Sequence, residues 1–366
     1  RKNGTYDYRY TGTDKKVRCV YAKTLEELRR KEEIIQRDKA DGIDYAAGEI
    51  IVSELIDRYV NLKRDWRENT RRAYGTAINR IKEDAFGQMK VRLVKPSDAK
   101  AFYIGLHDKG SKRNTITIFH SVLRPAFEMA VDDDIIRKNP FKFQVSDILQ
   151  NDAEKRTALT VAQQKAYLKY VQENSQDNYY DDIVILLGTG LRVSELYGLT
   201  KKDVDFKTRC IFVDHQLCRT ADKPYFITAP KTSSGVRTVP MSETVYAALK
   251  RVLKKRMASK SEPIIDGYGG FLFLDKSGMP KVAMHLENYM RNLQKKLNRI
   301  YGNTFPRVTP HVLRHTFCTN MQQGGIDVKS LQYLMGHSNV SVTLDVYTHT
   351  DFNAVQEAFR KVASSL

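Results

Sequence analysis

Four short segments between residues 188 and 350 carry side chains that could bind phosphate or transfer protons. In the first, GTGLRVSELYGL, Arg192 follows a Gly-Thr-Gly turn and Ser194–Glu195 open a helix. A guanidinium presents a rigid fork of N–H donors that matches the oxygens of a phosphate. An arginine beside a helix start is also commonly a surface ion pair, so this segment alone indicates only a candidate anion site.

The second segment, APKTSSGVRTVP, predicts two short strands around a tight turn at Thr232–Gly235. In this hairpin-like arrangement Lys231 lies at the base of the turn and Arg237 on the returning strand. A lysine at that place can enter a groove and act as a mobile proton donor. A charged, exposed hairpin is the alternative.

The third segment, TPHVLRHTF, places His311 and Arg314 on one face of a helix, because residues three apart are neighbours there. Pro310 suits the first turn of that helix. Histidine and arginine together can hydrogen-bond the non-bridging oxygens of a phosphate, whereas His315 lies on another face and is expected to pack or cap. No carboxylate or cysteine completes a ligand set in this segment, so the pattern does not favour a metal site.

In the fourth segment, LMGHSNVSVTLDVYTHT, Gly336 ends one helix, His337 follows it, and Tyr347 lies near the end of the next helix. A tyrosine is a poor nucleophile at its ordinary pKa of about 10, so it needs neighbours that accept its proton or stabilise its oxyanion. The chain has 20 tyrosines, most of which must be core or surface residues. A single tyrosine such as Tyr347 is therefore more commonly a core or surface residue than a nucleophile.

The elements that must position these groups are mainly helical. We expect a helix over Thr160–Asn174, an apolar run at 181–188, short strands within 209–240, and helices from Ser242 onward except in the Pro/Gly-rich region 261–280.

Upstream, residues 50–137 are typical of a helical bundle, with helix starts near Asn69–Thr70, after Pro96–Ser97 and after the sequence KGSKRN. Basic residues gather at two of these starts, where helix N-termini attract phosphate. The pattern favours a DNA clamp over a bundle with ordinary charged ends. The predicted contacts are Arg71, Arg72, Lys112 and Arg113.

Residues 4–23 alternate as two strands, and Thr24 caps the helix that follows. We expect Leu25, Leu28 and Ile34–Ile35 to form the buried stripe of that helix. One sheet face offers Arg9, Lys16 and Arg18, which either read a DNA groove or form a solvated surface.

Composition limits the class of protein. The chain has 366 residues, enough for two or three domains, and its net charge of +18 is spread over the whole length. Such a charge suits a partner with many phosphates. No run of eighteen apolar residues indicates a membrane span, and no secretory signal is visible. The four cysteines form no CxxC pair, which argues against a disulfide scaffold or a zinc ribbon and suits a reducing cytosol.

The ordered set formed by Arg192, Lys231, His311-x-x-Arg314, Gly336-His337 and Tyr347 resembles the active-site signature of the tyrosine recombinases. The likeness extends over the whole chain and is greatest to integrases of conjugative transposons, of the phage lambda integrase type. It implies a multidomain, mainly α fold with small β-sheets. The parts would be an arm-type DNA-binding module of sheet and helix (1–46), a helical SAM-like core-binding domain (47–140), a linker (141–157) and an α+β catalytic domain (158–366) with a tail helix (351–366).

The resemblance also implies roles. Tyr347 would attack the scissile phosphate and leave a 3′-phosphotyrosyl enzyme. Arg192, Arg314 and His311 would hold the phosphate, Lys231 would protonate the leaving 5′-oxygen, His337 would orient the site, and Glu195 would brace the arginines. Strand exchange would pass through a Holliday junction, with no metal or ATP required. Arm modules of this kind usually have a three-stranded sheet, whereas only two strands are clear here.

The implied partners are double-stranded DNA at core-type and arm-type sites of the element ends, target DNA, and further copies of the chain in a tetramer. An excisionase and a DNA-bending protein are possible additions, no membrane is involved, and the location would be the bacterial cytoplasm. Two alternatives stay open. A type IB topoisomerase shares the chemistry but exchanges no partners, and a catalytically silent DNA-binding protein could share the scaffold.

Overall fold

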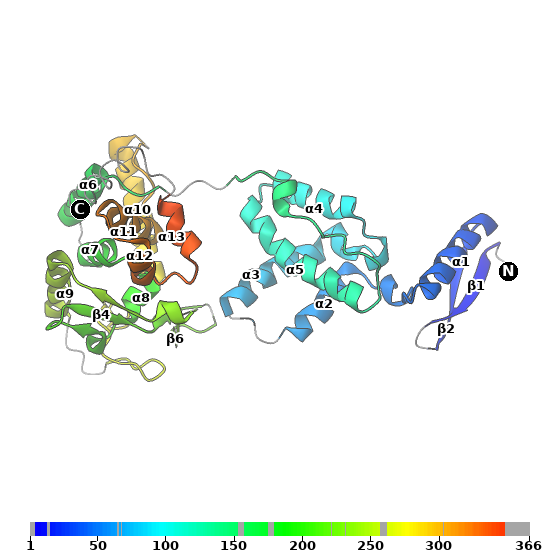
Figure 1. Ribbon diagram of the computed structural model, residues 1–366, viewed down its shortest axis with the longest axis horizontal. Helices are drawn as coiled ribbons and strands as arrows, with labels where there is room; N and C mark the ends of the chain where they lie inside the picture. The colour runs from blue at the N-terminus through cyan, green and yellow to red at the C-terminus, as the bar shows by residue number, and fades with distance from the viewer. Residues whose placement is uncertain are drawn as a thin grey trace, which may run out of the picture. The chain divides into compact units, whose positions relative to one another are not determined.

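The computed structural model describes residues 4–12, 15–63, 66, 68–152, 157–174, 179–220, 222–230, 232–256, 262–302 and 304–347, with only the backbone at 68, 69 and 345–347. The chain forms two compact units, Arg1–Glu154 and Lys155–Leu366. Figure 1 labels the elements of both units.

The first unit begins with a small sheet covered by one helix. Strands β1 (Tyr6–Thr11) and β2 (Val17–Ala22) pair antiparallel, and α1 (Leu25–Ala40) follows. The Thr24 side chain accepts a hydrogen bond from the backbone N–H of Glu27 at 3.1 Å, which is the predicted N-cap.

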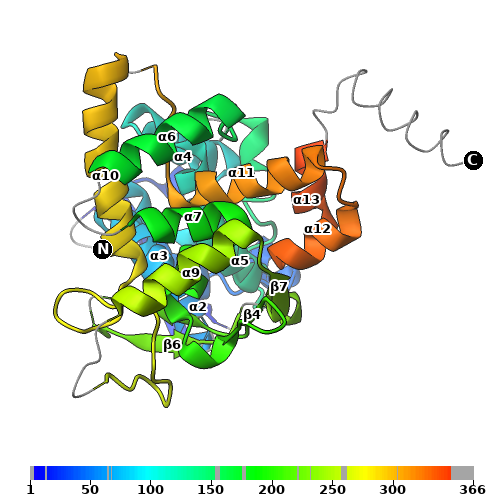
Figure 2. The ribbon, with the colours of Figure 1, turned by 90° about the vertical axis from the view of Figure 1, so that its left-hand side faces the viewer.

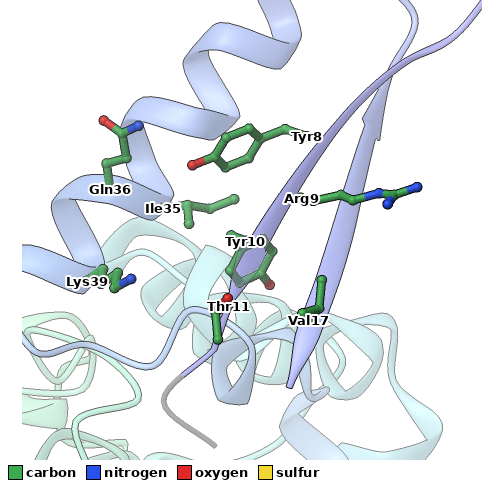
Figure 3. Close-up of a pocket in the computed structure, with 8 residues that line it drawn as sticks. All are labelled: Tyr8, Arg9, Tyr10, Thr11, Val17, Ile35, Gln36 and Lys39. Atoms are coloured by element: carbon green, nitrogen blue, oxygen red, sulfur yellow. The ribbon is translucent and has the colours of Figure 1, made fainter. Parts of the chain in front are cut away.

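The buried stripe of α1 is narrower than predicted. Leu28 and Ile35 are buried, as expected, because they lie seven residues apart on the face of α1 that covers the sheet. Leu25 and Ile34 are exposed, so their predicted burial is wrong. Figure 3 shows that the two sheet faces differ: Tyr8 points from β1 toward Ile35 of α1, whereas Arg9 points away from the helix. Arg18 is paired with Tyr10 and therefore lies on the face of Tyr8, opposite to Arg9, so the prediction that Arg9 and Arg18 share one face is wrong.

Four main helices complete the first unit, as the sequence predicts. They are α2 (Val52–Leu62), α3 (Glu68–Glu83), α4 (Pro96–Asp108) and α5 (Arg113–Asp132), with short 3₁₀ turns at Ala47–Glu49, Ala85–Gln88, Val91–Leu93 and Val145–Asp147. Their apolar faces enclose a core in which Phe86 and Phe102 stack at 4.6 Å and Phe141 packs on Phe127.

The second unit is a helical layer packed on short strands. Its helices are α6 (Val161–Asn174), α7 (Tyr180–Thr189), α8 (Val193–Gly198), α9 (Glu243–Lys255), α10 (Ala283–Tyr301), α11 (Pro310–Gln323), α12 (Val328–Met335) and α13 (Val340–Tyr347). Helix α7 lies between α9 and α11 (Figure 2) and is the most apolar of them, with Ile183, Ile185 and Leu186 buried. The apolar run predicted at 181–188 is therefore the central helix of the unit.

The strands form two separate sheets. In one, β3 (Val204–Asp205), β4 (Cys210–Val213) and β7 (Arg237–Pro240) pair in the order β3-β4-β7; in the other, β5 (Gln216–Cys218) pairs with β6 (Phe226–Thr228). The predicted hairpin around Thr232–Gly235 is wrong, because β6 and β7 belong to different sheets and a 3₁₀ turn at Ser233–Gly235 lies between them.

Candidate active site

Arg192 stands at the turn between α7 and α8, where it is the N-cap of α8. Gly190 ends α7 in the left-handed conformation with φ +63°, and a Cβ there would lie 2.4 Å from Cδ1 of Phe317, so only glycine fits. The Arg192 backbone N–H donates to Oε2 of Glu195 at 2.8 Å, and its Nη1 donates to Oε1 at 2.6 Å. The side chain of Arg192 stays 36% exposed, so part of the guanidinium faces solvent.

Glu195 is buried between two arginines. Besides Arg192, it accepts hydrogen bonds from Arg237 Nη2 at 2.9 Å and Nη1 at 3.3 Å. Burial alone would raise the pKa of the Glu195 carboxyl, but the hydrogen bonds and charges of Arg237 and Arg192 outweigh it and hold that pKa below its ordinary value. The carboxylate is therefore ionised at neutral pH and fixes the position of Arg192.

Arg314 reaches the same place from α11. Its Nη1 donates to the carbonyl oxygen of Gly190 at 2.5 Å and its Nη2 donates to that of Met335. Burial, together with the charge of Arg192, lowers the pKa of the Arg314 guanidinium to about 9. A buried cation beside a second cation favours a bound anion, since an anion would relieve both effects.

His337 lies in the turn after α12. Gly336 ends that helix with φ +60°. The carbonyl oxygen of Gly336 lies 3.5 Å from Arg192 Nη2. The His337 Nδ1 lies 3.0 Å from Thr343 Oγ1 of α13. Burial, with the charges of Arg314, Arg192 and Arg237, lowers the pKa of the imidazole to about 4, so His337 is neutral at pH 7.

The structure thus brings together four of the predicted residues: Arg192, Glu195, Arg314 and His337. His311 is exposed at the start of α11, directly after Pro310. Lys231 lies outside the described residues. Tyr347 is the last residue of α13, four positions after Thr343, and its side chain also lies outside the described part of the structure.

Arg237 is the contributor that sequence reasoning missed. Its side chain is completely buried, and Nε donates to the carbonyl oxygen of Leu334 at 2.7 Å. The sequence placed it on a strand but gave no sign of its partners. The sequence held one sign of its burial. Side chains two residues apart in a strand lie on the same face, and Arg237 shares its face with the apolar Val239, which is buried.

A second group has metal-ligating side chains: Asp203, Asp214 and His215 offer oxygen and nitrogen atoms within 4.8 Å of one another. Both ring nitrogens of His215 are already hydrogen-bonded, to Asp214 Oδ1 at 2.5 Å and to the carbonyl oxygen of Gly198 at 2.8 Å. Asp203 in turn accepts from Thr200. These contacts describe a structural network that anchors the end of α8.

Comparison with known proteins decides the class. Residues 144–354 match the model of the phage integrase family. The chain belongs to this family, the tyrosine recombinases. Its members cleave and rejoin DNA, and this chain is an enzyme of that class. The predicted fold class is confirmed as well.

Several relatives of this tyrosine recombinase are known. The chain is 38% identical to the transposase from transposon Tn916 of Enterococcus faecalis, over 99% of this chain and 93% of that protein. It is 26% identical to a XerC-like tyrosine recombinase of Caldanaerobacter subterraneus, over 95% of this chain and 93% of the relative. A solved structure of the Tn1549 transposon integrase with circular intermediate DNA matches with a TM-score of 0.79 and 40% identity, covering 86% of this chain and 100% of that one.

The fold of the recombinase also matches lambda integrase. The structure of a lambda integrase tetramer bound to a Holliday junction gives a TM-score of 0.59 at 16% identity, over 94% of this chain and 93% of that one. Within the described residues, every helix is too short or too polar to cross a membrane. Tyrosine recombinases generally act without a metal ion.

Proposed function

We propose that this recombinase excises and integrates a mobile element such as a conjugative transposon. The full-length similarity to the Tn916 transposase and the similarity to the Tn1549 integrase support this substrate class. Cleavage would leave a 3′-phosphotyrosyl enzyme and a free 5′-hydroxyl, and two rounds of exchange would pass through a Holliday junction. The phosphotyrosyl bond conserves the energy of the broken phosphodiester, so neither a metal ion nor ATP is needed.

One observation carries the proposal: two arginines from distant segments converge on the carbonyl oxygens of Met335 and Gly336. Arg314 is buried and Arg192 is partly open to solvent, which suits the two non-bridging oxygens of one phosphate. Such preorganised donors each stabilise a transition state by about 3–4 kcal/mol. The negative charge that develops on the phosphate in the transition state would be stabilised by Arg192 and Arg314, which are already positioned.

The remaining roles follow from chemistry. The Tyr347 oxygen would attack phosphorus while the bond to the 5′-oxygen breaks. Lys231 would give its proton to that leaving oxygen, and His311 would hydrogen-bond the phosphate and accept the tyrosine proton. His337, which is neutral and hydrogen-bonded to Thr343, would donate to or orient the same phosphate. Glu195 would brace the arginines.

The domain division is part of the proposal. Residues 1–46 would bind arm-type DNA and residues 47–140 would bind core-type DNA. Residues 141–157 would form the linker to the catalytic domain, 158–366, whose last part, 351–366, would form the tail helix. Residues 348–366, which include the whole tail, lie outside the described residues. The proposed DNA contacts are Arg9, Lys16, Arg18, Arg71, Arg72, Lys112 and Arg113.

The proposed assembly is a tetramer on double-stranded DNA in the bacterial cytoplasm, joining element ends to target DNA. The lambda integrase tetramer on a Holliday junction is the structural precedent. An excisionase and a DNA-bending protein would set the direction of the reaction.

The test is covalent trapping. The protein is incubated without metal or ATP with a nicked duplex that carries an end of its own element, and the products are separated on a denaturing gel. We expect a slow protein–DNA band that Tyr347→Phe abolishes and that Tyr301→Phe, at an exposed tyrosine, leaves intact.

Two outcomes would contradict the proposal. Tight binding without a covalent band would indicate a DNA-binding protein. A covalent band together with relaxation of supercoils, but without exchange between two marked duplexes, would indicate a topoisomerase.

A further inference from the structure

Arg237 is the most completely buried cation of the second unit among the described residues, and its guanidinium bonds to the segments that carry the active site. It pairs with Glu195 through two hydrogen bonds, at 2.9 and 3.3 Å. Its Nε donates to Leu334 near the end of α12, and Nη1 also donates to the carbonyl oxygen of Gly235 at 3.1 Å. A buried charge is costly unless it is fully paired, so these contacts are needed to keep the guanidinium in place.

We infer that Arg237 is a positioning residue for strand cleavage: it keeps Arg192 available to the scissile phosphate by sharing Glu195, and it fixes the turn that carries His337. The inference rests on the proposed function of Arg192 and His337. Arg237 itself has no exposed surface with which to touch DNA.

Arg237 sets the balance of charge around Arg192. Arg192, Glu195 and Arg237 together carry one net positive charge, because the carboxylate lies between two guanidinium groups. Without Arg237, Glu195 would form a neutral pair with Arg192 alone. Arg192 would then be held by the carboxylate, and its attraction for a phosphate would be cancelled.

Arg237 also forms a mechanical link between β7 and α12. Arg237 binds the carbonyl oxygen of Leu334, and the next residue, Thr238, donates its backbone N–H to the hydroxyl of Tyr333 at 3.0 Å. A Cβ on Gly336 would lie 3.1 Å from Arg237 Nη1, so the guanidinium packs directly under the turn before His337. Strand β7 follows the turn that begins after Lys231, and through Arg237 it holds α12 in place.

The sharpest test is a double-mutant cycle in single-turnover cleavage of the nicked duplex. Arg237→Gln should slow formation of the covalent complex about 100-fold, the size of effect expected for losing one preorganised donor, while DNA binding is retained. Adding Glu195→Gln to Arg237→Gln should recover at least about tenfold, because the unshared carboxylate no longer holds Arg192. The same Glu195→Gln change in the presence of Arg237 should slow cleavage.

A purely structural role predicts that cleavage follows the folded fraction in every variant, because Glu195→Gln also removes the buried carboxylate that Arg237→Gln leaves with one partner. Recovery of the cleavage rate per folded molecule, with the folded fraction measured by circular dichroism, therefore distinguishes the positioning role. Arg237→Lys retains the charge without the two-pronged hydrogen bonds and should fall between wild type and Arg237→Gln. This second variant keeps the test open if Arg237→Gln fails to fold. Arg251→Gln is the matched control, since Arg251 pairs with Asp181, which keeps Lys255 as a second partner.

A second measurement does not depend on activity. Loss of the Arg237 charge should raise the pKa of His337, which can be measured by NMR titration of the His337 ring. Equal cleavage rates for wild type and a folded Arg237→Gln variant would overturn the role of Arg237 alone. A wild-type protein that forms no covalent complex would overturn the proposed function and this role with it.

Discussion

Arg314 Nη1 donates to the carbonyl oxygen of Gly190 at 2.5 Å, although the two residues are 124 positions apart in the chain. The bond ties α11 to the turn between α7 and α8, which is the turn that presents Arg192. Because glycine is required at position 190 to end α7 and to admit Phe317, the geometry of that turn and the location of Arg314 are coupled.

Arg314→Lys should therefore disable cleavage without removing the charge. A lysine cannot donate to the carbonyl oxygens of Gly190 and Met335 and also present a planar pair of donors to a phosphate. We expect the single-turnover rate of covalent complex formation to fall by about 100- to 1,000-fold, as when an oxyanion donor is lost.

Arg307→Lys is the control, because Arg307 is exposed shortly before α11. Both variants should bind the nicked duplex with similar affinity, measured by fluorescence anisotropy. A rapid Arg314→Lys enzyme would show that the two carbonyl contacts do not position the guanidinium for catalysis.

Gly336→Ala should impair both stability and cleavage. Its φ of +60° disfavours any side chain, and the new Cβ would lie 3.1 Å from Arg237 Nη1 and from the carbonyl oxygen of Ser234. Left-handed backbone costs an L-residue about 1–2 kcal/mol, which thermal or chemical denaturation would detect. The contact should also displace the turn before His337.

Gly278→Ala separates these two effects. Gly278 has a φ of +83°, but a Cβ added there would have no neighbouring atom within 4 Å, so alanine should cost stability alone. Cleavage by Gly278→Ala should stay near the wild-type rate under conditions where the protein is folded. Equal loss of cleavage in both variants would mean that general destabilisation explains the result.

The ring of His337 should titrate with a pKa of about 4 rather than near 6.5 in the DNA-free protein. Between these pH values His337 is protonated in the unfolded chain but neutral in the folded chain. The free energy of unfolding should therefore decrease as the pH falls through this window. Above about pH 6.5 both states are neutral at this residue and the effect vanishes.

NMR spectra of the ring, assigned by comparison with His337→Gln, provide the measurement. The variant should also show a weaker loss of stability than the wild type over the same pH window. A titration midpoint at the ordinary histidine value would contradict the burial and the three nearby positive charges that the structure assigns to His337.

Local patterns in the sequence were enough to select Arg192, Glu195, Arg314 and His337, which the structure brings together. Each stands beside a helix start or a glycine that ends a helix, and such signals extend over only a few residues. The main helices of the first unit followed from hydrophobic periodicity for the same reason. The structure then adds the hydrogen bonds that link these side chains to one another and to the turns beside them.

Long-range contacts could not be predicted in this way. The partners of Arg237 lie 42 and 97 positions away, at Glu195 and Leu334. The pairing of β7 with β4 rather than β6 likewise depends on where buried residues such as Val239 and Ile211 meet, not on the turn between the strands. A turn-forming sequence therefore predicted a hairpin that the sheets do not contain.

One such long-range contact alters the expectation for the DNA clamp. The backbone N–H of Arg113, at the start of α5, donates to both carboxylate oxygens of Asp152, at 3.1 and 3.2 Å. The helix end that the sequence assigned to a phosphate is therefore already occupied by an anion. Phosphate binding at Lys112 and Arg113 would have to displace this carboxylate or bind beside it.

Asp152→Asn should consequently tighten DNA binding. The amide oxygen can still cap α5, while the repulsion between the carboxylate and a phosphate is removed. Charges at a helix terminus contribute about 0.3–1 kcal/mol, so the affinity should rise by about two- to fivefold at low salt. Asp133→Asn removes the same charge at the opposite end of α5 and should change affinity less.

The measurement is the dissociation constant of a core-type duplex over a range of salt concentrations. If the proposed contacts with many phosphates are made, wild-type binding should weaken steeply with salt, and Arg72→Ala should reduce the slope by about one. If the Asp152→Asn variant binds the duplex no more tightly than the Asp133→Asn variant, no phosphate approaches the start of α5. Lys112 and Arg113 would then not be DNA contacts.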